Sequence, residues 1–219
     1  ALNYGDTGAD GILEEGGDNI AIAMTATYDI TLKLGYPDYT YTVERASFDK
    51  RALFFSEGQN LEIYDIGLFT DGWAVAKFKN ITSDGLTGSD LTFPDTDFPM
   101  FRLADAYLMY AEAVKRGGGG SESTAVDYIN ALRERAYSSQ DANITTADLT
   151  LEFILDERAR ELYWECHRRT DLVRYGLFTG GDYLWPWKGN AFAGAATDSK
   201  YDIFPLPNAD LNANSNFQQ

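Results

Sequence analysis

Residues 98–116 read FPMFRLADAYLMYAEAVKR, and this stretch decides the fold class. Apolar side chains recur in it every three or four residues, in one row formed by Met100, Leu103, Tyr107, Tyr110 and Val114. A neighbouring row consists of Ala104, Leu108 and Ala111. This period predicts an amphipathic helix, and the small side chains of the second row allow another helix to pack closely against it.

The glycines at 117–120 end this helix, and a second helix is predicted after them. Thr124 is its expected N-cap, with Asp127 at the third helical position. Its inner face is expected to consist of Ala125, Tyr128, Ile129, Leu132 and Ala136. Two antiparallel helices joined by a short turn form one repeat unit of the tetratricopeptide type, which needs neighbours to bury its apolar face.

A third helix is predicted from about Leu151 to Tyr175, with Thr150 as its cap. Its buried side is expected to contain Leu151, Ile154, Leu155, Ala159, Leu162 and Cys166. Because Cys166, the only cysteine, falls on this apolar side, we interpret it as a buried structural residue and not as a reactive thiol. The only histidine, His167, is interpreted as a structural residue of the same helix.

The segments that flank the helical part have a different character. Alternating apolar residues predict extended segments from Ile20 to Leu34 and from Tyr39 to Val43, and Trp73 to Phe78 has the composition of a short strand. The predicted fold is therefore mainly α, within the α+β class. The expected parts are a strand- and loop-rich region over 1–99, a helical core over 100–176, and an extended segment over 177–219 that wraps over the helices.

Composition limits the kinds of partner that the chain can bind. The 219 residues carry a net charge of −16, with 44% hydrophobic and 14% aromatic residues. Such a chain can bury a core, but nucleic acid is an unlikely partner for it because phosphate binding needs a basic face. Neutral ligands such as sugars, or cations, remain compatible with this charge.

Charged residues are densest in the third predicted helix. The residues expected to form ion pairs there are Glu157, Arg160, Glu161, Glu165 and Arg169. Carboxylates on one helix face could flank a glycosidic bond, so a glycosidase that uses Glu161 or Glu165 is one reading. The other reading is structural, since each carboxylate has an arginine three or four residues away, which keeps it ionised, whereas a general acid must hold its proton. We adopt the structural reading and expect no enzyme activity.

No cofactor is expected from the motifs of the chain. The loop Asp6–Gly11 resembles the start of a calcium loop, but Gly8 stands where an acid is needed and Gly17 stands where the bidentate Glu is needed. The acidic loop 90–97 is a second place for calcium, so calcium stays open as an alternative.

Aromatic side chains offer the best candidate ligand contacts. Tyr36, Tyr39 and Tyr41 lie in and after a turn that contains a proline, where rings can stack on the apolar faces of sugars. Trp185 and Trp187 flank Pro186 and are interpreted as anchors of an irregular segment. The tyrosine turn is therefore the predicted ligand-binding site.

Four blocks of the chain together resemble the SusD/RagB family. These blocks are 98–113, 130–136, 156–162 with 168–176, and the ending around 203–207 with 211–214 and 218–219. Asp49-x-Arg51 and Gly72-Trp73 through Lys77 agree more loosely. The resemblance covers about the last three quarters of the chain, and it rests on framework residues, so no ligand contact is carried over from it.

The resemblance implies a glycan-binding, surface-exposed lipoprotein of the outer membrane of Bacteroidetes, which serves nutrient uptake with a SusC-like TonB-dependent transporter. It also implies that most tetratricopeptide-type repeats and the lipidated cysteine precede Ala1, so the N-terminal remainder is an expected partner of the exposed helix face. A helical scaffold that binds only protein is the alternative.

Overall fold

The computed structural model describes residues 28–32 and 39–43 by their backbone, and residues 49–55, 57–82, 84–90, 92–214 and 216 with their side chains. The strands are β1 (Tyr28–Leu32), β2 (Tyr39–Val43), β3 (Phe54–Phe55) and β4 (Ala74–Val75). The α-helices are α2 (Leu103–Lys115), α3 (Glu122–Tyr137), α4 (Leu151–Leu162), α5 (Arg168–Arg174) and α6 (Asn208–Ala213). Two short 3-10 helices are η3 (Lys188–Asn190) and η4 (Ser199–Asp202). The prediction of a mainly helical fold with short strands is confirmed.

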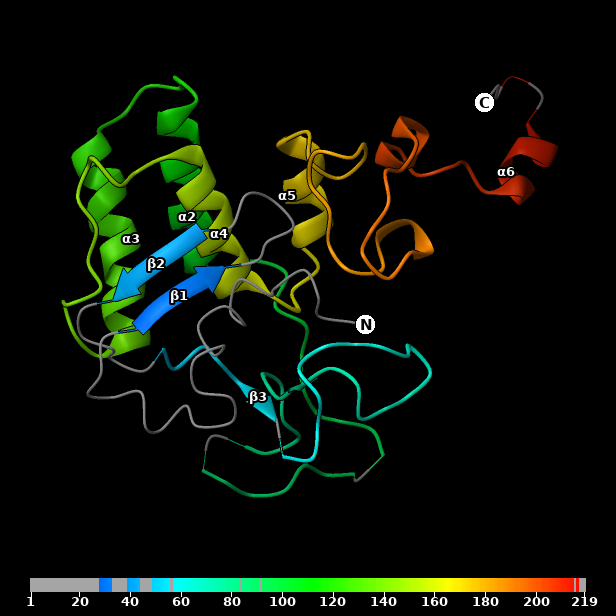
Figure 1. Ribbon diagram of the computed structural model, residues 1–219, viewed down its shortest axis with the longest axis horizontal. Coiled ribbons are helices and arrows are strands. Elements are labelled where there is room, and N and C mark those ends of the chain that lie inside the picture. The colour runs from blue at the N-terminus through cyan, green and yellow to red at the C-terminus, as the bar shows by residue number, and fades with distance from the viewer. Residues whose placement is uncertain are drawn as a thin grey trace.

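Helices α2, α3 and α4 pack together and form the main core (Figure 1). Of the two predicted rows on α2, the row of Ala104, Leu108 and Ala111 is buried. Leu103 and Met100, which were expected on an apolar face, are exposed. The small row faces the neighbouring helices because alanine lets their backbones come close.

The starts of α3 and α4 are each set by a side-chain cap. The Thr150 hydroxyl accepts a hydrogen bond from the Phe153 amide at 3.1 Å, so this predicted cap is confirmed. For α3 the predicted cap was wrong, since the Ser121 hydroxyl caps it by accepting from the Thr124 amide at 3.3 Å. The helix begins one turn earlier because the preceding Gly120 has a φ of 100°, which turns the chain directly into Ser121.

The third predicted helix is broken in the structure. Helix α4 ends at Leu162 and α5 begins at Arg168, and between them Trp164 and Cys166 have φ values of 60° and 62°. The prediction of one helix to Tyr175 is therefore wrong. Cys166 is exposed, so its assignment to the buried side was also wrong. His167 occupies the N-cap position of α5.

The strands form two small antiparallel pairs. β1 pairs with β2, with Ile30 opposite Tyr41, so the predicted extended segments are confirmed where they are described; 20–27 and 33–34 lie outside the described residues. β3 pairs with β4, with Phe54 opposite Val75. The strand predicted over Trp73–Phe78 contains only the two residues of β4, because this pairing covers only two positions.

The segment after α5 divides into two parts. Tyr183, Trp185 and Phe178 pack against Leu172 of α5 and Leu155 of α4 in a second small core. Beyond η4, residues 203–214 are mostly exposed, and α6 projects away from the helices (Figure 1). The first part therefore packs on α4 and α5, whereas most side chains of the second part are exposed. Among the described helices, none has the length and apolar character that crossing a bilayer requires.

We expect Leu108→Ala to lower the free energy of unfolding by about 2–5 kcal/mol, because Leu108 is fully buried and its loss leaves a cavity between helices. Urea denaturation measures this change. Met109→Ala, on the exposed side of the same helix, is the control and should change stability by less than about 0.5 kcal/mol. Equal effects of the two substitutions would contradict the packing described for α2.

Candidate functional site

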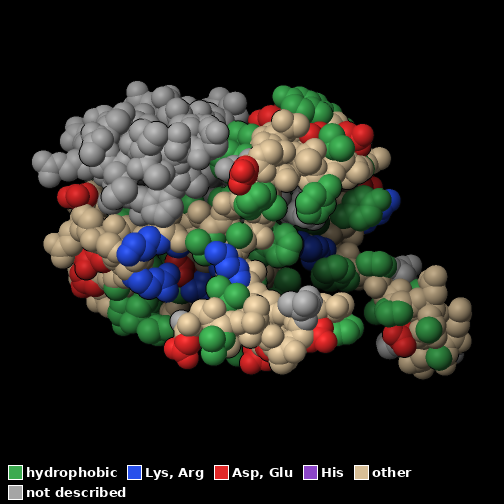
Figure 2. All heavy atoms as spheres, turned by 90° about the horizontal axis from the view of Figure 1, so that it is seen from below, with side chains coloured by type: hydrophobic (Ala, Val, Ile, Leu, Met, Phe, Trp, Pro, Cys, Tyr) green, Lys and Arg blue, Asp and Glu red, His purple; other side chains and the backbone are tan. Residues whose placement is uncertain are grey.

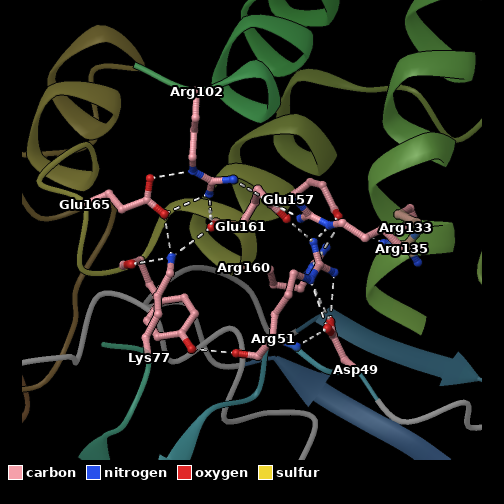
Figure 3. Close-up of polar contacts among 11 residues, drawn as sticks. Asp49, Arg51, Lys77, Arg102, Arg133, Arg135, Glu157, Arg160, Glu161 and Glu165 are labelled. Atoms are coloured by element: carbon pink, nitrogen blue, oxygen red, sulfur yellow. Dashed lines mark hydrogen bonds and ion pairs between the residues drawn. The ribbon is translucent and has the colours of Figure 1, made fainter. Parts of the chain in front are cut away.

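Three buried glutamates follow one another on α4 and in the turn after it. Glu157 and Glu161 belong to α4, and Glu165 follows its end. Their side chains are 0%, 2% and 2% exposed, and we call them the carboxylate column. Buried carboxylates need partners of opposite charge, and Figure 3 shows that the partners reach the column from several parts of the chain.

Glu157 is held by three arginines. Its carboxylate lies 2.7 Å from the guanidinium of Arg51, 2.7 Å from that of Arg133 and 3.3 Å from that of Arg160. Burial alone would raise the pKa of Glu157, but these three cations outweigh burial and hold that pKa well below its ordinary value. Arg51 is itself held by Asp49 at 2.8 Å, so residues 49–51 are fastened to α4.

Glu161 and Glu165 share the guanidinium of Arg102. Arg102 lies 2.5 Å from a carboxylate oxygen of Glu161 and 2.6 Å from one of Glu165. Glu161 also pairs with Arg135 at 2.5 Å and with Arg51 at 3.2 Å. Arg102 precedes α2 and Arg135 lies in the last turn of α3, so one glutamate ties three segments together.

Lys77 and Arg102 also satisfy the end of α4. The Lys77 ammonium donates to the carbonyls of Glu161 and Tyr163 at 3.0 and 2.8 Å and to the Glu165 carboxylate at 2.6 Å. Arg102 donates to the same Glu161 carbonyl at 2.5 Å. Cations suit the negative end of a helix, and these donors replace the hydrogen bonds that a longer helix would have made. They are therefore the physical reason that α4 can stop here.

Of the ion pairs predicted within one helix, the structure contains the Glu157–Arg160 pair, while Glu165 and Arg169 have other partners. Glu157 and Arg160 pair within α4, as their spacing predicted. Glu165 pairs with Lys77 and Arg102, whereas Arg169 donates to the carbonyl of Tyr201 and lies over the ring of Phe204. The expected Glu165–Arg169 pairing was wrong because α4 ends before Glu165, which lies in the turn, and Arg169 belongs to the separate helix α5.

A second buried network lies on another side of α4. Arg158 pairs with Asp105 of α2 at 2.8 Å and with Asp171 of α5 at 2.9 Å. Arg174 then links Asp171 to Glu112 of α2. Since both sides of α4 are used in this way, its charged residues from Asp156 to Glu161 are buried and not displayed to solvent.

This environment is unsuited to general-acid chemistry. The pKa of Glu165 is lowered, because Arg102 and Lys77 outweigh the effect of burial. A general acid at neutral pH needs the opposite shift. Glu161 forms ion pairs with three arginines, and both glutamates named as glycosidase candidates hold separate segments of the chain together.

A pocket of about 520 Å³ opens at the end of α4 that carries the carboxylate column. Its charged lining residues are Lys50, Arg51, Lys77, Arg102, Arg135, Glu161 and Glu165. Its other lining residues are Leu53, Phe78, Pro99, Ala136 and Tyr163. Figure 2 shows Lys and Arg side chains gathered around a hollow on the face that it presents.

Three aromatic side chains form a second candidate site, which we call the aromatic platform: Tyr64, Trp187 and Phe192. The rings of Tyr64 and Phe192 are stacked, with centroids 5.8 Å apart and an interplanar angle of 17°. Trp187 meets Phe192 edge-on at 5.9 Å. Tyr64 is 65% exposed although Phe192 covers one of its faces, so its other face is open to solvent.

The loop that carries Tyr64 is held in place by polar contacts. The carboxylate of Asp71 accepts hydrogen bonds from the Tyr64 and Asp65 amides at 3.0 and 2.9 Å. The indole N–H of Trp187 donates to the carbonyl of Ile63, a buried residue, at 2.8 Å. Trp187 was interpreted as an anchor, and it does anchor this loop while its ring contributes to the platform. Trp185 packs on Phe178 and Tyr183, as the same interpretation predicted.

The tyrosines predicted as the ligand site are not tested by the structure. Tyr39 and Tyr41 lie on β2, but their side chains, and Tyr36 as a whole, lie outside the described residues. The calcium loop at Asp6–Gly11 lies outside them as well. In the loop at 90–97, the Asp90 and Asp95 carboxylates accept hydrogen bonds from neighbouring residues. The described residues contain no group of three acids, histidines or cysteines arranged to hold a metal.

Comparisons with known proteins agree on one family. The sequence profile of the SusD family matches residues 38–219. The "Starch-binding protein SusD" of Bacteroides thetaiotaomicron is 43% identical over 179 residues, which are 80% of this chain and 31% of that protein. The "SusD-like protein P25" of Formosa agariphila is 46% identical over 81 residues, which are 36% of this chain and 15% of that protein.

A solved structure supports the same assignment. A SusD superfamily protein from Bacteroides thetaiotaomicron matches with a TM-score of 0.55 and 26% identity. The match covers 78% of this chain and 36% of that one. The chain therefore corresponds to part of the length of these relatives.

We expect Glu157→Gln to lower the free energy of unfolding by about 3–5 kcal/mol at pH 7, because it leaves buried arginines without their counter-ion. In the unmodified chain, the lowered pKa of Glu157 gives stability that is present above the ordinary value of 4.5 and is lost as the pH falls. Glu157→Gln should lack this part of the pH dependence. Glu152→Gln, on an exposed position of α4, is the control for urea denaturation and should have little effect.

Asp156→Asn should raise the free energy of unfolding at pH 7, in contrast to Glu157→Gln. Burial raises the pKa of Asp156 to about 6, despite the nearby Arg160 and Arg168. Since the folded chain prefers the protonated form, ionisation at pH 7 destabilises it on the order of 2–3 kcal/mol. The free energy of unfolding of Asp156→Asn should therefore exceed that of the original chain by an amount that grows as the pH rises from about 4 to 6. Below about pH 4 the two chains should differ little. Thermal unfolding of both chains at about pH 4 and pH 7 measures this difference in stability. A difference that does not change with pH would contradict this account.

Proposed function

The chain belongs to the SusD family, and on that premise we propose that it captures glycans at a bacterial cell surface without acting on them chemically. The exposed face of Tyr64 on the aromatic platform is the observation that carries this proposal. Starch is the first ligand to test, because the relative with 43% identity is named as a starch-binding protein.

The platform has the physical properties of a sugar contact. Sugar rings have apolar C–H faces that stack on aromatic planes. The loop around Tyr64 is fixed by Asp71 and Trp187 before any ligand arrives, so little conformational freedom is lost on binding. Asp65 beside the ring is exposed and has a carboxylate that can accept from sugar hydroxyls.

The tyrosine turn is a second proposed contact for the same ligand. The sequence places Tyr36, Tyr39 and Tyr41 in and after a turn that contains a proline. On the extended backbone of β2, Tyr39 and Tyr41 are two residues apart, which puts them on the same face of the strand. A long glycan can engage two aromatic sites at once, which raises its apparent affinity.

Membership of the SusD family also supports a proposal for the cellular role. We propose that the protein lies on the outer membrane as a lipoprotein, works in nutrient uptake, and has a TonB-dependent transporter and the remainder of its own chain as partners. The large apolar residues exposed around the start of α2 support an interface there: Phe98, Met100, Phe101 and Leu103.

Tyr64→Ala should weaken binding of malto-oligosaccharides or another recognised glycan about five- to tenfold, because it removes the open stacking face. Isothermal titration calorimetry after a glycan-array screen measures this. Tyr201→Ala is the matched control, since Tyr201 is similarly exposed but lies on η4. The same affinity for both variants would rule out the platform.

Three further results separate the alternatives. A loss of affinity in Tyr39→Ala with Tyr41→Ala, and none in Tyr64→Ala, would move the site to the tyrosine turn and leave glycan capture intact. An array without hits, together with co-purification of a transporter, would favour the protein-binding scaffold. Release of reducing ends that Glu161→Gln abolishes would contradict the proposal altogether.

A further inference from the structure

The basic pocket at the end of α4 has an unbalanced charge. Five cations and two carboxylates line it, in a chain whose net charge is −16. The inner carboxylates Asp49 and Glu157 do not remove the excess, because they bring Arg133 and Arg160 with them. Among the described residues, this cluster therefore has more positive than negative groups.

The cations on the floor of the pocket have their hydrogen bonds satisfied. Arg51 is shared among Asp49, Glu157 and Glu161. Arg102 and Lys77 each donate to a carboxylate and to the carbonyl end of α4. Donors that are engaged in this way hold the structure together and have little capacity left for a ligand.

Arg135 and Lys50 differ from the floor. Within the described residues, the Arg135 guanidinium makes one hydrogen bond, to Glu161, and its side chain is 56% exposed. The Lys50 ammonium, also exposed, donates to the hydroxyl of Ser138. The two residues are neighbours in space, because the Lys50 amide donates to the carbonyl of Ala136, which follows Arg135. Together they present several N–H donors at the rim of a positively charged pocket.

We propose that this pocket binds the carboxylate or sulfate group of an acidic sugar, with Arg135 and Lys50 as the contacting residues. The proposal goes beyond neutral glycan capture at the aromatic platform, because it adds a separate site with a different ligand class. A guanidinium fork and an ammonium are the side chains that best match such oxyanions. The wall of the pocket also includes Phe78, which is 39% exposed and has an aromatic ring against which a sugar ring can lie.

The size of the pocket favours a saccharide unit over a protein partner. A volume of about 520 Å³ is in the range of small-molecule sites. The negative charge of the whole chain does not prevent anion binding there, because charges more than about 8 Å away are largely screened at physiological salt. The local excess of cations then decides the sign of the field that the ligand meets.

Titration calorimetry with digalacturonate tests the proposal, with its methyl ester as the neutral probe. Arg135→Ala and Lys50→Ala should each weaken digalacturonate binding about tenfold or more, as expected for a lost charge-assisted hydrogen bond. Lys79→Ala is the control, because Lys79 is an exposed cation outside the pocket lining. Arg135→Lys should keep part of the affinity, and sulfate should compete with digalacturonate.

Each other outcome overturns the proposal. Equal binding of the methyl ester would show that charge is not recognised, and equal weakening by Lys79→Ala would show only diffuse attraction. Stronger binding of a triglutamate peptide would reassign the pocket to an acidic protein segment. Tyr64→Ala should weaken neutral glycan binding and leave digalacturonate binding unchanged. Neutral glycan binding that Tyr64→Ala does not weaken would contradict the platform and not the pocket. Lys50→Ala removes an exposed side chain, and after Arg135→Ala the buried Glu161 still has Arg51 and Arg102 as partners. Circular dichroism and urea denaturation verify that the variants are folded.

Discussion

The burial of the carboxylate column against cations from distant segments is the interaction on which the rest of the structure depends. Glu157, Glu161 and Glu165 can lie out of water only because arginines and a lysine reach them from before α2, from α3 and from the loop regions. Removing one partner leaves a buried charge uncompensated, which destabilises a protein more than the intact pair stabilises it. The column therefore selects one arrangement of segments: Asp49–Arg51, Lys77 and Arg102 have to meet α4 together. It also explains why residues 49–99, whose described side chains include few buried apolar ones, are nevertheless attached to the helices.

The same constraint marks the limit of what could be predicted from the sequence. The apolar period was enough to predict the helix α2 and most of the inner face of α3, and the residue type at 150 was enough to predict the cap of α4. These features depend on neighbours in the chain. It failed between Leu162 and Arg168, where the apolar pattern continues through Cys166 but the helix stops. The cause is tertiary: Lys77 and Arg102 take the carbonyls at the end of α4, and neither residue is near that end in sequence. Spacing likewise predicted the Glu157–Arg160 pair and missed the partners of Glu165. The loosely matching Asp49-x-Arg51 and Lys77 were the available signal, because both prove to be contacts of α4.

The candidate sites were harder to predict for a different reason. The aromatic platform joins Tyr64 to Trp187 and Phe192, which are more than a hundred residues away, and no periodic pattern links them. Trp187 could be recognised as an anchor from its irregular surroundings, but its target, the Ile63 carbonyl, could not. Loops of this kind tolerate change at exposed positions, and the Asp71 carboxylate and the Trp187 indole are among the contacts that fix this one. A ligand contact on such a loop can be replaced without disturbing the helices.

This separation gives the two proposed sites different prospects for variation. On the platform, Tyr64 is exposed and can be substituted without loss of a core contact, whereas Trp187 also anchors the loop. The basic pocket is built on the carboxylate column, so its floor is fixed by folding: Arg51, Lys77 and Arg102 cannot change without exposing buried glutamates to an unpaired state. Only its rim, Arg135 and Lys50, is open to substitution at little structural expense, because both side chains are exposed. Because the folded structure requires the cations of the floor, the pocket keeps a positive electrostatic potential that favours anions. The two rim residues then determine whether an anion is bound.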